Sequence, residues 1–399
     1  MATPSFPFPP MGVRPDRPRS FGILSTYPPT PCGLANFSSA LARGLSTNGT
    51  AVRIVRVGDG STSADGRVIG ELINGSASSV AASARLLNEC DVAVVQHEYG
   101  LYGGADGEEI LEILANLEVP SIVIAHTVLS APTAHQRAVL VAVAELADQV
   151  IVMSEAARDR LCRQFEVESN RVTTIWHGAA IPARSSQTTD DGRPTMLTWG
   201  LLGPGKGIER VVDAMPSLHD LPEQPRYLVA GQTHPKVLAA DGEAYRQARV
   251  AQAARNGVSG SVVFDSAYRD LASLAALIQS AAVVVLPYDS RDQATSGVLV
   301  DAIAAGRPVV ATAFPHAVEL LSSGAGLVVD HDDADGMASA LRRVLVEPGL
   351  ADRMAGEASR LAPSLGWPVI AAAYLALGNR LLAEREGLAS PALQSPAVA

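Results

Sequence analysis

Two short segments of the sequence carry residue types that bind phosphate. The first, residues 200–207, reads Gly-Leu-Leu-Gly-Pro-Gly-Lys-Gly and lies between a strand pattern and the helical pattern that begins at Ile208. Glycine-rich turns expose main-chain N–H groups, and the compact ammonium of Lys206 suits a diphosphate oxygen. Gly207 stands where a P-loop places the serine or threonine that holds magnesium, so a nucleotide triphosphatase is disfavoured. The alternative is a solvated loop lysine without a function.

The second segment, residues 286–306, is predicted to run from a strand through a loop into a helix. Thr295, Ser296 and Gly297 fall near the predicted start of that helix. The free N–H groups and the positive dipole end at a helix start favour an anion, and a diphosphate would fit there. The alternative is a capping motif with no ligand.

Apolar runs of strand length alternate along the chain with segments of helix length. Continuous Val, Ile and Leu are typical of strands buried on both faces of a parallel sheet, so the pattern predicts an α/β fold. The first half contains six such runs, residues 21–25, 52–57, 91–96, 121–125, 149–153 and 172–176. The second half contains six more, residues 196–200, 227–230, 261–265, 283–286, 309–312 and 326–329.

The two halves predict two doubly wound, Rossmann-like domains. Residues 182–194 are polar and bounded by prolines, which is typical of a linker. We expect ligand in the cleft between the domains, where the carboxyl ends of the strands lie. The expected boundaries are a disordered tail at 1–18, a domain at 19–181, the linker at 182–194, a domain at 195–367, a helix at 368–387 and a disordered tail at 388–399.

Composition excludes several classes of protein. Hydrophobic residues make up 47% of the 399 residues and charged residues 18%, as in ordinary globular proteins. A net charge of −10 disfavours nucleic acid and anionic membranes as partners. The longest apolar runs are far shorter than the roughly 20 residues that span a bilayer, and the N-terminus lacks a secretory pattern, so we expect a cytoplasmic protein without stable membrane insertion. Three scattered cysteines form neither a zinc set nor a disulfide pattern.

Over roughly residues 20–385, the chain resembles the family 4 retaining glycosyltransferases of the GT-B fold. Three segments carry the resemblance. Residues 25–37 are similar to the family's glycine loop, residues 199–208 to its phosphate-binding lysine loop, and residues 293–312 to the segment that holds two carboxylates eight positions apart. The resemblance implies that the first domain binds an acceptor and the second a nucleotide sugar donor.

Residue by residue, the resemblance implies the following roles. Gly33 lets the backbone approach the donor diphosphate, and Lys206 neutralises the nucleoside diphosphate as it leaves. Asp301 stands where the family's second glutamate holds the donor ribose. His126, just beyond a predicted strand, matches a histidine near the transferred sugar. Gln293 replaces the first glutamate, and an amide cannot stabilise positive charge on the anomeric carbon as a carboxylate does.

Other candidates follow predicted strands. His97 and Glu98 lie in a loop of polar, aromatic and glycine residues that suits an acceptor sugar, and His234 is within reach of the donor. The loop that ends at Tyr268 is a candidate for contacts with the nucleotide base. Loop structure without a ligand is the alternative in each case, and His177 is expected to pack at the hinge.

We therefore predict a retaining, metal-independent hexosyltransferase that needs no cofactor. It would move a hexose from a donor of the GDP-mannose or UDP-glucose type to a carbohydrate or other small hydroxylated acceptor. Because Gln293 is not a carboxylate, and because Leu201 lies near the place of the family's usual arginine, one alternative is a catalytically silent binder of sugar nucleotides. A GT-B epimerase or phosphorylase is a second alternative.

Overall fold

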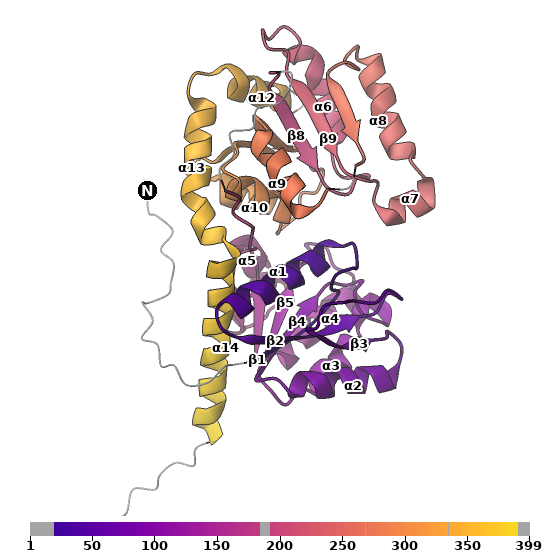
Figure 1. Ribbon diagram of the computed structural model, residues 1–399, viewed down its shortest axis with the longest axis vertical. Helices are drawn as coiled ribbons and strands as arrows, with labels where there is room; N and C mark the ends of the chain where they lie inside the picture. Colours follow the sequence, from indigo (N-terminus) through magenta and orange to yellow (C-terminus); the bar gives the residue numbers. More distant parts are fainter. Residues whose placement is uncertain (1–19, 184–191, 268, 334, 390–399) are drawn as a thin grey trace, which may run out of the picture.

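The computed structural model describes residues 20–183, 192–267, 269–333 and 335–389, which form two α/β domains (Figure 1). The predicted tail at 1–18, most of the predicted linker and residues 390–399 lie outside the described residues. The first two residues of the tail predicted at 388–399 belong instead to the last helix, which ends at Ala389. Every strand that the sequence predicts is present, with ends within two residues of the prediction. Two parallel-sheet, Rossmann-like domains are thereby confirmed as the fold class.

The N-terminal domain has a seven-stranded parallel sheet in the order β3-β2-β1-β4-β5-β6-β7. The central strands β4 and β5 are buried along their whole length, and β1 is buried except for Ser20, as a sheet covered on both faces requires. The strand β2 differs, because Ala51 and Arg53 are exposed. The strands are β1 (Ser20–Ser25), β2 (Ala51–Val57), β3 (Val68–Leu72), β4 (Val92–His97), β5 (Ser121–Ala125), β6 (Gln149–Val152) and β7 (Val172–Thr174).

The C-terminal domain has a six-stranded parallel sheet in the order β10-β9-β8-β11-β12-β13. The strands are β8 (Thr195–Trp199), β9 (Arg226–Ala230), β10 (Val262–Asp265), β11 (Val283–Leu286), β12 (Val309–Thr312) and β13 (Gly326–Val329). In both sheets the strand order reverses at the first strand of the domain, which is the switch point where doubly wound folds bind ligands.

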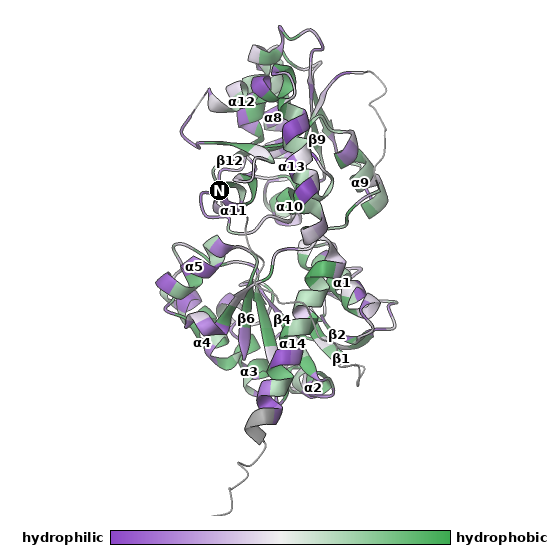
Figure 2. Cartoon of the chain, turned by 90° about the vertical axis from the view of Figure 1, so that its left-hand side faces the viewer, coloured by the Kyte–Doolittle hydropathy of each residue, from purple (hydrophilic) through white to green (hydrophobic). Residues whose placement is uncertain are grey.

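Helices connect the strands and cover both sheets, and the apolar strands lie inside (Figure 2). The helices are α1 (Gly33–Thr47), α2 (Ala77–Asn88), α3 (Ile110–Ala115), α4 (Ala134–Leu146), α5 (Glu155–Gln164), α6 (Ile208–Ala214), α7 (Pro235–Asp241), α8 (Ala244–Arg255), α9 (Leu271–Ser280), α10 (Gly297–Ala304), α11 (Pro315–Leu321), α12 (Gly336–Val346), α13 (Leu350–Leu365) and α14 (Trp367–Ala389), with 3₁₀ turns η1 (Ala105–Gly107), η2 (Ser169–Arg171) and η3 (Met215–Leu218).

The last helix returns to the first domain. Figure 1 shows α13 beside the C-terminal domain and α14 beside the N-terminal domain. Ile370, Tyr374 and Leu377 of α14 are buried in the same apolar cluster as Phe21 of β1 and Phe37 of α1. The C-terminal helix is therefore part of the core of the N-terminal domain.

The chain crosses between the domains twice, and the two crossings are hydrogen-bonded to each other. The Ala179 N–H donates to the carbonyl of Leu365 at 2.8 Å, and the Trp367 N–H donates to the carbonyl of Ala179 at 3.2 Å. Ala179 and Gly366 form an isolated parallel bridge. The hinge is thus two chain segments joined by a single β-bridge.

Candidate active site

The lysine loop joins β8 to α6 and is fixed by close backbone contacts. Gly207 has φ of +63°, and a side-chain carbon there would lie 1.7 Å from the Pro287 carbonyl oxygen. Only glycine fits, which explains physically why the serine or threonine of a P-loop is missing. The Asp289 N–H donates to the carbonyl of Gly205 at 3.0 Å, which ties the loop to the segment after β11.

Lys206 lies where that loop meets the end of β11. Its Nζ is 4.6 Å from the ring centroid of Tyr288, a buried aromatic face that attracts a cation. Burial lowers the pKa of Lys206. Within the described part of the chain, no carboxylate is paired with this ammonium. A partly desolvated cation without a counter-ion is suited to binding an anion.

The segment after β11 leads into α10 and presents the start of that helix at the domain interface. The Ser296 hydroxyl caps α10 by accepting a hydrogen bond from the Leu299 N–H at 3.3 Å. Gln293 donates from Nε2 to the carbonyl of Thr295 at 3.1 Å. A side-chain carbon on Gly297 would lie 3.0 Å from Nε2 of His177, so the helix start abuts the hinge.

Asp301 lies one turn into α10. Burial raises the pKa of this carboxyl to about 7, and no ion pair or side-chain hydrogen bond to another described residue offsets that effect. Lys206 follows β8 and Asp301 lies on the helix after β11, so the same end of the C-terminal sheet holds a lysine and a carboxyl whose pKa is near neutral pH, neither paired with another described residue. This pairing of sites suits a ligand that carries both an anionic group and hydroxyl groups.

The N-terminal sheet ends in neutral polar side chains. His126 follows β5, and its Nε2 is hydrogen-bonded to Oε1 of Gln96 at the end of β4. Burial lowers the pKa of His126 to about 3 and that of His97 to about 4, so both rings are uncharged at neutral pH. Neither ring nitrogen of His97 has a hydrogen-bond partner among the described residues, although the ring is buried.

Glu98 lies beside these histidines on the loop after β4. It accepts hydrogen bonds from the Thr127 hydroxyl at 2.6 Å and from the Tyr99 N–H at 3.1 Å. Burial raises the pKa of Glu98. Since Thr127 follows His126 directly, the structure brings the predicted acceptor residues and the predicted sugar-side histidine to adjacent strand ends.

Aromatic rings connect this edge to the start of α10. Phe37 of α1 makes edge contacts with His126 at 5.0 Å and with His177 at 5.1 Å between ring centroids. His177 in turn faces Gly297. The carboxyl ends of the two sheets therefore meet at one interface, with His177 packed at the hinge as the sequence predicts.

Gly33 follows β1 of the N-terminal sheet, and His234 follows β9 of the C-terminal sheet. Gly33 begins α1, and a side-chain carbon there would meet nothing within 4 Å. His234 uses its ring Nδ1 to accept a hydrogen bond from the Lys236 N–H at 3.1 Å. Its main-chain N–H donates to the carbonyl of Leu202 in the lysine loop at 2.8 Å. Tyr268 lies outside the described residues.

Sequence reasoning missed Tyr288, Arg160 and Glu319. Tyr288 lies under Lys206, whereas Arg160 and Glu319 make hydrogen bonds between the domains. The only sequence signal for Tyr288 was its place directly after the predicted strand 283–286. The other two residues lie on ordinary helical patterns and gave no signal.

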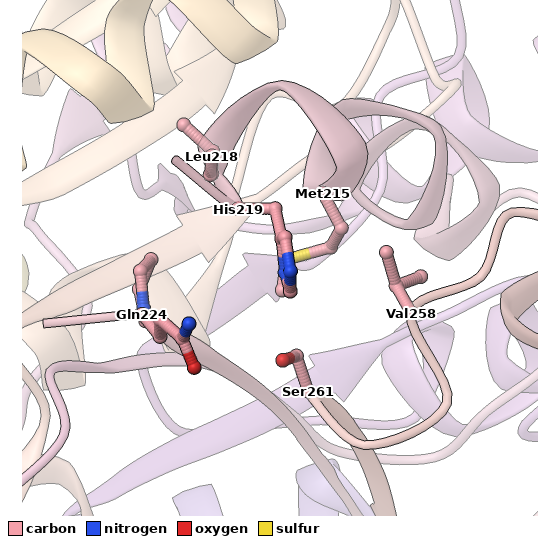
Figure 3. Close-up of a pocket in the computed structure, with 7 residues that line it drawn as sticks. Met215, Leu218, His219, Gln224, Val258 and Ser261 are labelled. Carbon is pink, nitrogen blue, oxygen red and sulfur yellow. The ribbon is translucent and has the colours of Figure 1, made fainter. Parts of the chain in front are cut away.

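A pocket lined by Met215, His219, Gln224 and Ser261 lies elsewhere (Figure 3). Its lining includes residues directly before β9 and β10, which places it at the amino ends of those strands. The candidate site is at the opposite, carboxyl ends.

In the described residues, no helix is long and apolar enough to cross a bilayer, and no three His, Cys, Asp or Glu side chains are grouped as metal ligands.

Two Rossmann-like domains whose strand ends meet at a hinged interface define the GT-B class of folds. Residues 31–180 match the family described as Glycosyltransferase Family 4, and residues 193–347 match the family described as Glycosyl transferases group 1. The chain belongs to the family 4 glycosyltransferases of the GT-B fold.

Solved structures with this fold cover nearly the whole chain. A glycosyltransferase from Rickettsia africae has a TM-score of 0.71 and 13% identity, covering 91% of this chain and 98% of that one. Anabaena HepE in complex with UDP and glucose has a TM-score of 0.70 and 18% identity, covering 92% of this chain and 99% of that one. Sucrose-phosphate synthase from Thermosynechococcus elongatus has a TM-score of 0.70 and 18% identity, covering 92% of this chain and 100% of that one.

One curated relative matches at the sequence level. Alpha-D-kanosaminyltransferase from Streptomyces kanamyceticus is 26% identical over 224 residues, which is 53% of this chain. The match spans about half of that relative, 55% of its length.

Proposed function

We propose that this protein transfers a hexose from a nucleotide diphosphate sugar to a hydroxyl group of a carbohydrate or other small acceptor. The observation that carries the proposal is the pair of unpaired groups Lys206 and Asp301 at the carboxyl end of the C-terminal sheet. Membership of the glycosyltransferase families supports it.

In this reaction the bond between the anomeric carbon and the phosphate oxygen breaks, and a bond from that carbon to the acceptor oxygen forms. The proton of the acceptor hydroxyl passes to an oxygen of the departing diphosphate. Negative charge grows on the departing nucleoside diphosphate, where Lys206 and the N–H groups at the start of α10 stabilise it. Asp301 accepts hydrogen bonds from the donor ribose, and Gln293 orients the sugar. We assign retention of the anomeric configuration and independence of metal ions to this mechanism.

The acceptor lies against the N-terminal edge in this proposal. His97 and Glu98 bind its hydroxyl groups, and His126 lies between acceptor and transferred sugar. Neutral imidazoles both donate and accept hydrogen bonds, and the Glu98 carboxyl accepts them, which matches the chemistry of hydroxyl groups. Gly33 leaves open space at the start of α1, which supports backbone approach of the donor diphosphate there.

A second function is a sugar-nucleotide binding protein without transfer activity. Gln293 in place of a carboxylate favours it, as does Leu201, an apolar side chain 38% exposed near the place of an arginine in the family. Both functions predict donor binding, and only the first predicts turnover.

A two-stage experiment tests the proposal. UDP, GDP, UDP-glucose and GDP-mannose are first screened by thermal unfolding, because a ligand at 100 times its Kd stabilises the folded protein by about 2.7 kcal/mol. The stabilising donor is then incubated with a panel of acceptors, and the products are followed by NMR. Transfer with an unchanged anomeric configuration supports the proposal. Binding with neither transfer nor donor hydrolysis supports the silent binder instead.

A further inference from the structure

His316, on the short helix α11, contacts the segment from Gln293 to Ser296 twice. Its imidazole Nδ1 accepts a hydrogen bond from the Ser296 N–H at 2.9 Å. Its main-chain N–H donates to the carbonyl of Gln293 at 3.3 Å. One residue thus holds both ends of the segment that leads into α10.

The protonation state of His316 suits this contact. The side chain is fully buried, and burial lowers its pKa to about 3, so the ring is neutral at pH 7. His177 is the titratable group that affects it, and it too is neutral, since burial lowers its pKa to about 4. With Nδ1 as the acceptor, the proton is on Nε2. A protonated ring would place an N–H against the N–H of Ser296 and break the contact.

The hydrogen bond fixes groups that the proposed donor site uses. Ser296 caps α10, and Gln293 points its amide at Thr295, so the direction of both side chains depends on the path of this backbone. Without the imidazole, the Ser296 N–H would be a buried donor with no acceptor, which favours movement of the segment.

The N-terminal domain holds the same region from the other side. Arg160 of α5 donates to the carbonyl of Asp292 at 3.0 Å and to that of Val128 at 2.6 Å. Glu319, one turn after His316 on α11, accepts from the N–H groups of Glu155 and Ala156 at 2.9 and 3.1 Å. The support of the segment is therefore continuous with the contact between the domains.

We propose that His316 is a positioning residue that holds residues 293–297 in the conformation that receives the sugar donor. The inference rests on the proposed function, because it assigns that segment to the donor. Through Glu319, the same helix α11 ties this conformation to the arrangement of the two domains.

The test compares His316→Ala, His316→Asn and a control, His331→Ala, in the full-length protein. Asparagine offers an oxygen close to the place of Nδ1 and keeps an acceptor for Ser296. His331 is a buried histidine of the same domain whose carbonyl accepts from Arg210, and among the described contacts it makes no hydrogen bond to residues 293–297. Hydrogen exchange of the peptide that contains Ser296 is measured by mass spectrometry without ligand, and donor and acceptor KM values are measured where transfer is detected.

We expect His316→Ala to speed exchange of that peptide at least tenfold and to raise the donor KM at least tenfold, with the acceptor KM within twofold. His316→Asn restores both within about threefold, and His331→Ala changes neither. Unchanged exchange and donor KM in His316→Ala overturn the inference, as does an equal loss in His331→Ala. A wild-type protein that binds no nucleotide or nucleotide sugar overturns the proposed function instead, and the exchange measurement separates the two failures.

Discussion

The two sheets end in different kinds of surface. At the C-terminal sheet, Lys206 lies between glycines with left-handed backbone and Asp301 lies on α10, and neither has a partner of opposite charge in the described chain. At the N-terminal sheet, Gln96, His97 and His126 are packed together and uncharged. The same topology therefore presents a lysine and an aspartate on one side of the interface, and on the other side neutral hydrogen-bonding groups beside the Glu98 carboxyl.

This difference matches the two substrates of the proposed reaction. A diphosphate is anionic and gains charge as it leaves, so cations and helix starts stabilise it most. A hydroxyl acceptor is neutral and needs groups that donate and accept. Substitutions on the C-terminal side should therefore act mainly on turnover, whereas those on the N-terminal side should act on acceptor binding and on the response to pH.

The largest effect is expected from Lys206→Ala. Loss of a preorganised cation at the leaving group should lower kcat roughly a hundredfold, or about 3 kcal/mol in the transition state. Lys206→Arg is the matched control, and we expect only partial recovery because the guanidinium is larger and planar. Steady-state kinetics and circular dichroism check both variants. Wild-type kinetics in a folded Lys206→Ala protein would mean that Lys206 does not stabilise the leaving group.

Gln293 should give the next largest effect. If its amide orients the sugar by hydrogen bonds, Gln293→Ala costs about 1 to 3 kcal/mol in transition-state stabilisation. Gln293→Glu should keep or increase transfer, because it restores the charge that the family carries there. Donor affinity and transfer are measured side by side for the three proteins. An active wild type with an unaffected alanine variant would place Gln293 away from the transferred sugar.

The neutral side is tested by pH. The folded-state pKa of His97, about 4, is below the unfolded value of about 6.5, so the unfolded chain binds more protons between these values. Stability from this group is complete above pH 6.5 and is lost as the pH falls toward 4. At pH 5 the loss is about 2 kcal/mol.

We therefore expect the free energy of unfolding to fall by about 2 kcal/mol more in wild type than in His97→Leu between pH 7.5 and pH 5. Denaturant titrations at the two pH values check the difference. Equal losses in both proteins would mean that His97 is protonated in the folded protein, which contradicts a neutral acceptor edge.

The smallest effect is expected from the removal of metal ions. We expect EDTA to leave transfer unchanged, because Lys206 and the start of α10 supply the positive charge that a metal ion would otherwise supply. Initial rates with EDTA and with added magnesium check this. Strict magnesium dependence would show that Lys206 and the start of α10 do not supply enough positive charge without a metal ion.

Local pattern predicted most of the sheets, because buried parallel strands are continuously apolar. The missed strand, β3, is an edge strand in which Gly70 and Glu71 interrupt the apolar run. Glu71 is there because it pairs at 2.8 Å with Arg56, an arginine buried on the neighbouring strand. Such a pair depends on which strands are neighbours, and a single strand pattern does not contain that information.

The candidate site likewise contains residues that local pattern predicts and contacts that it does not predict. Lys206, His126 and Ser296 were found because they follow or precede recognisable elements. The contact between Lys206 and Tyr288 joins different strand ends, and the contact between Glu319 and α5 joins different domains. These contacts are set by how the loops and domains pack, so residue types and spacing did not predict them.

The return of α14 to the N-terminal domain means that one cut cannot separate the two halves. A chain cleaved between residues 184 and 191 leaves an N-terminal fragment whose apolar cluster around Phe21 and Phe37 has lost Tyr374 and Leu377. Those side chains stay on the C-terminal fragment. The C-terminal fragment thus holds a part of the core of the N-terminal domain, and the nicked protein is expected to remain a single particle in solution, with the fragments reassembling when mixed.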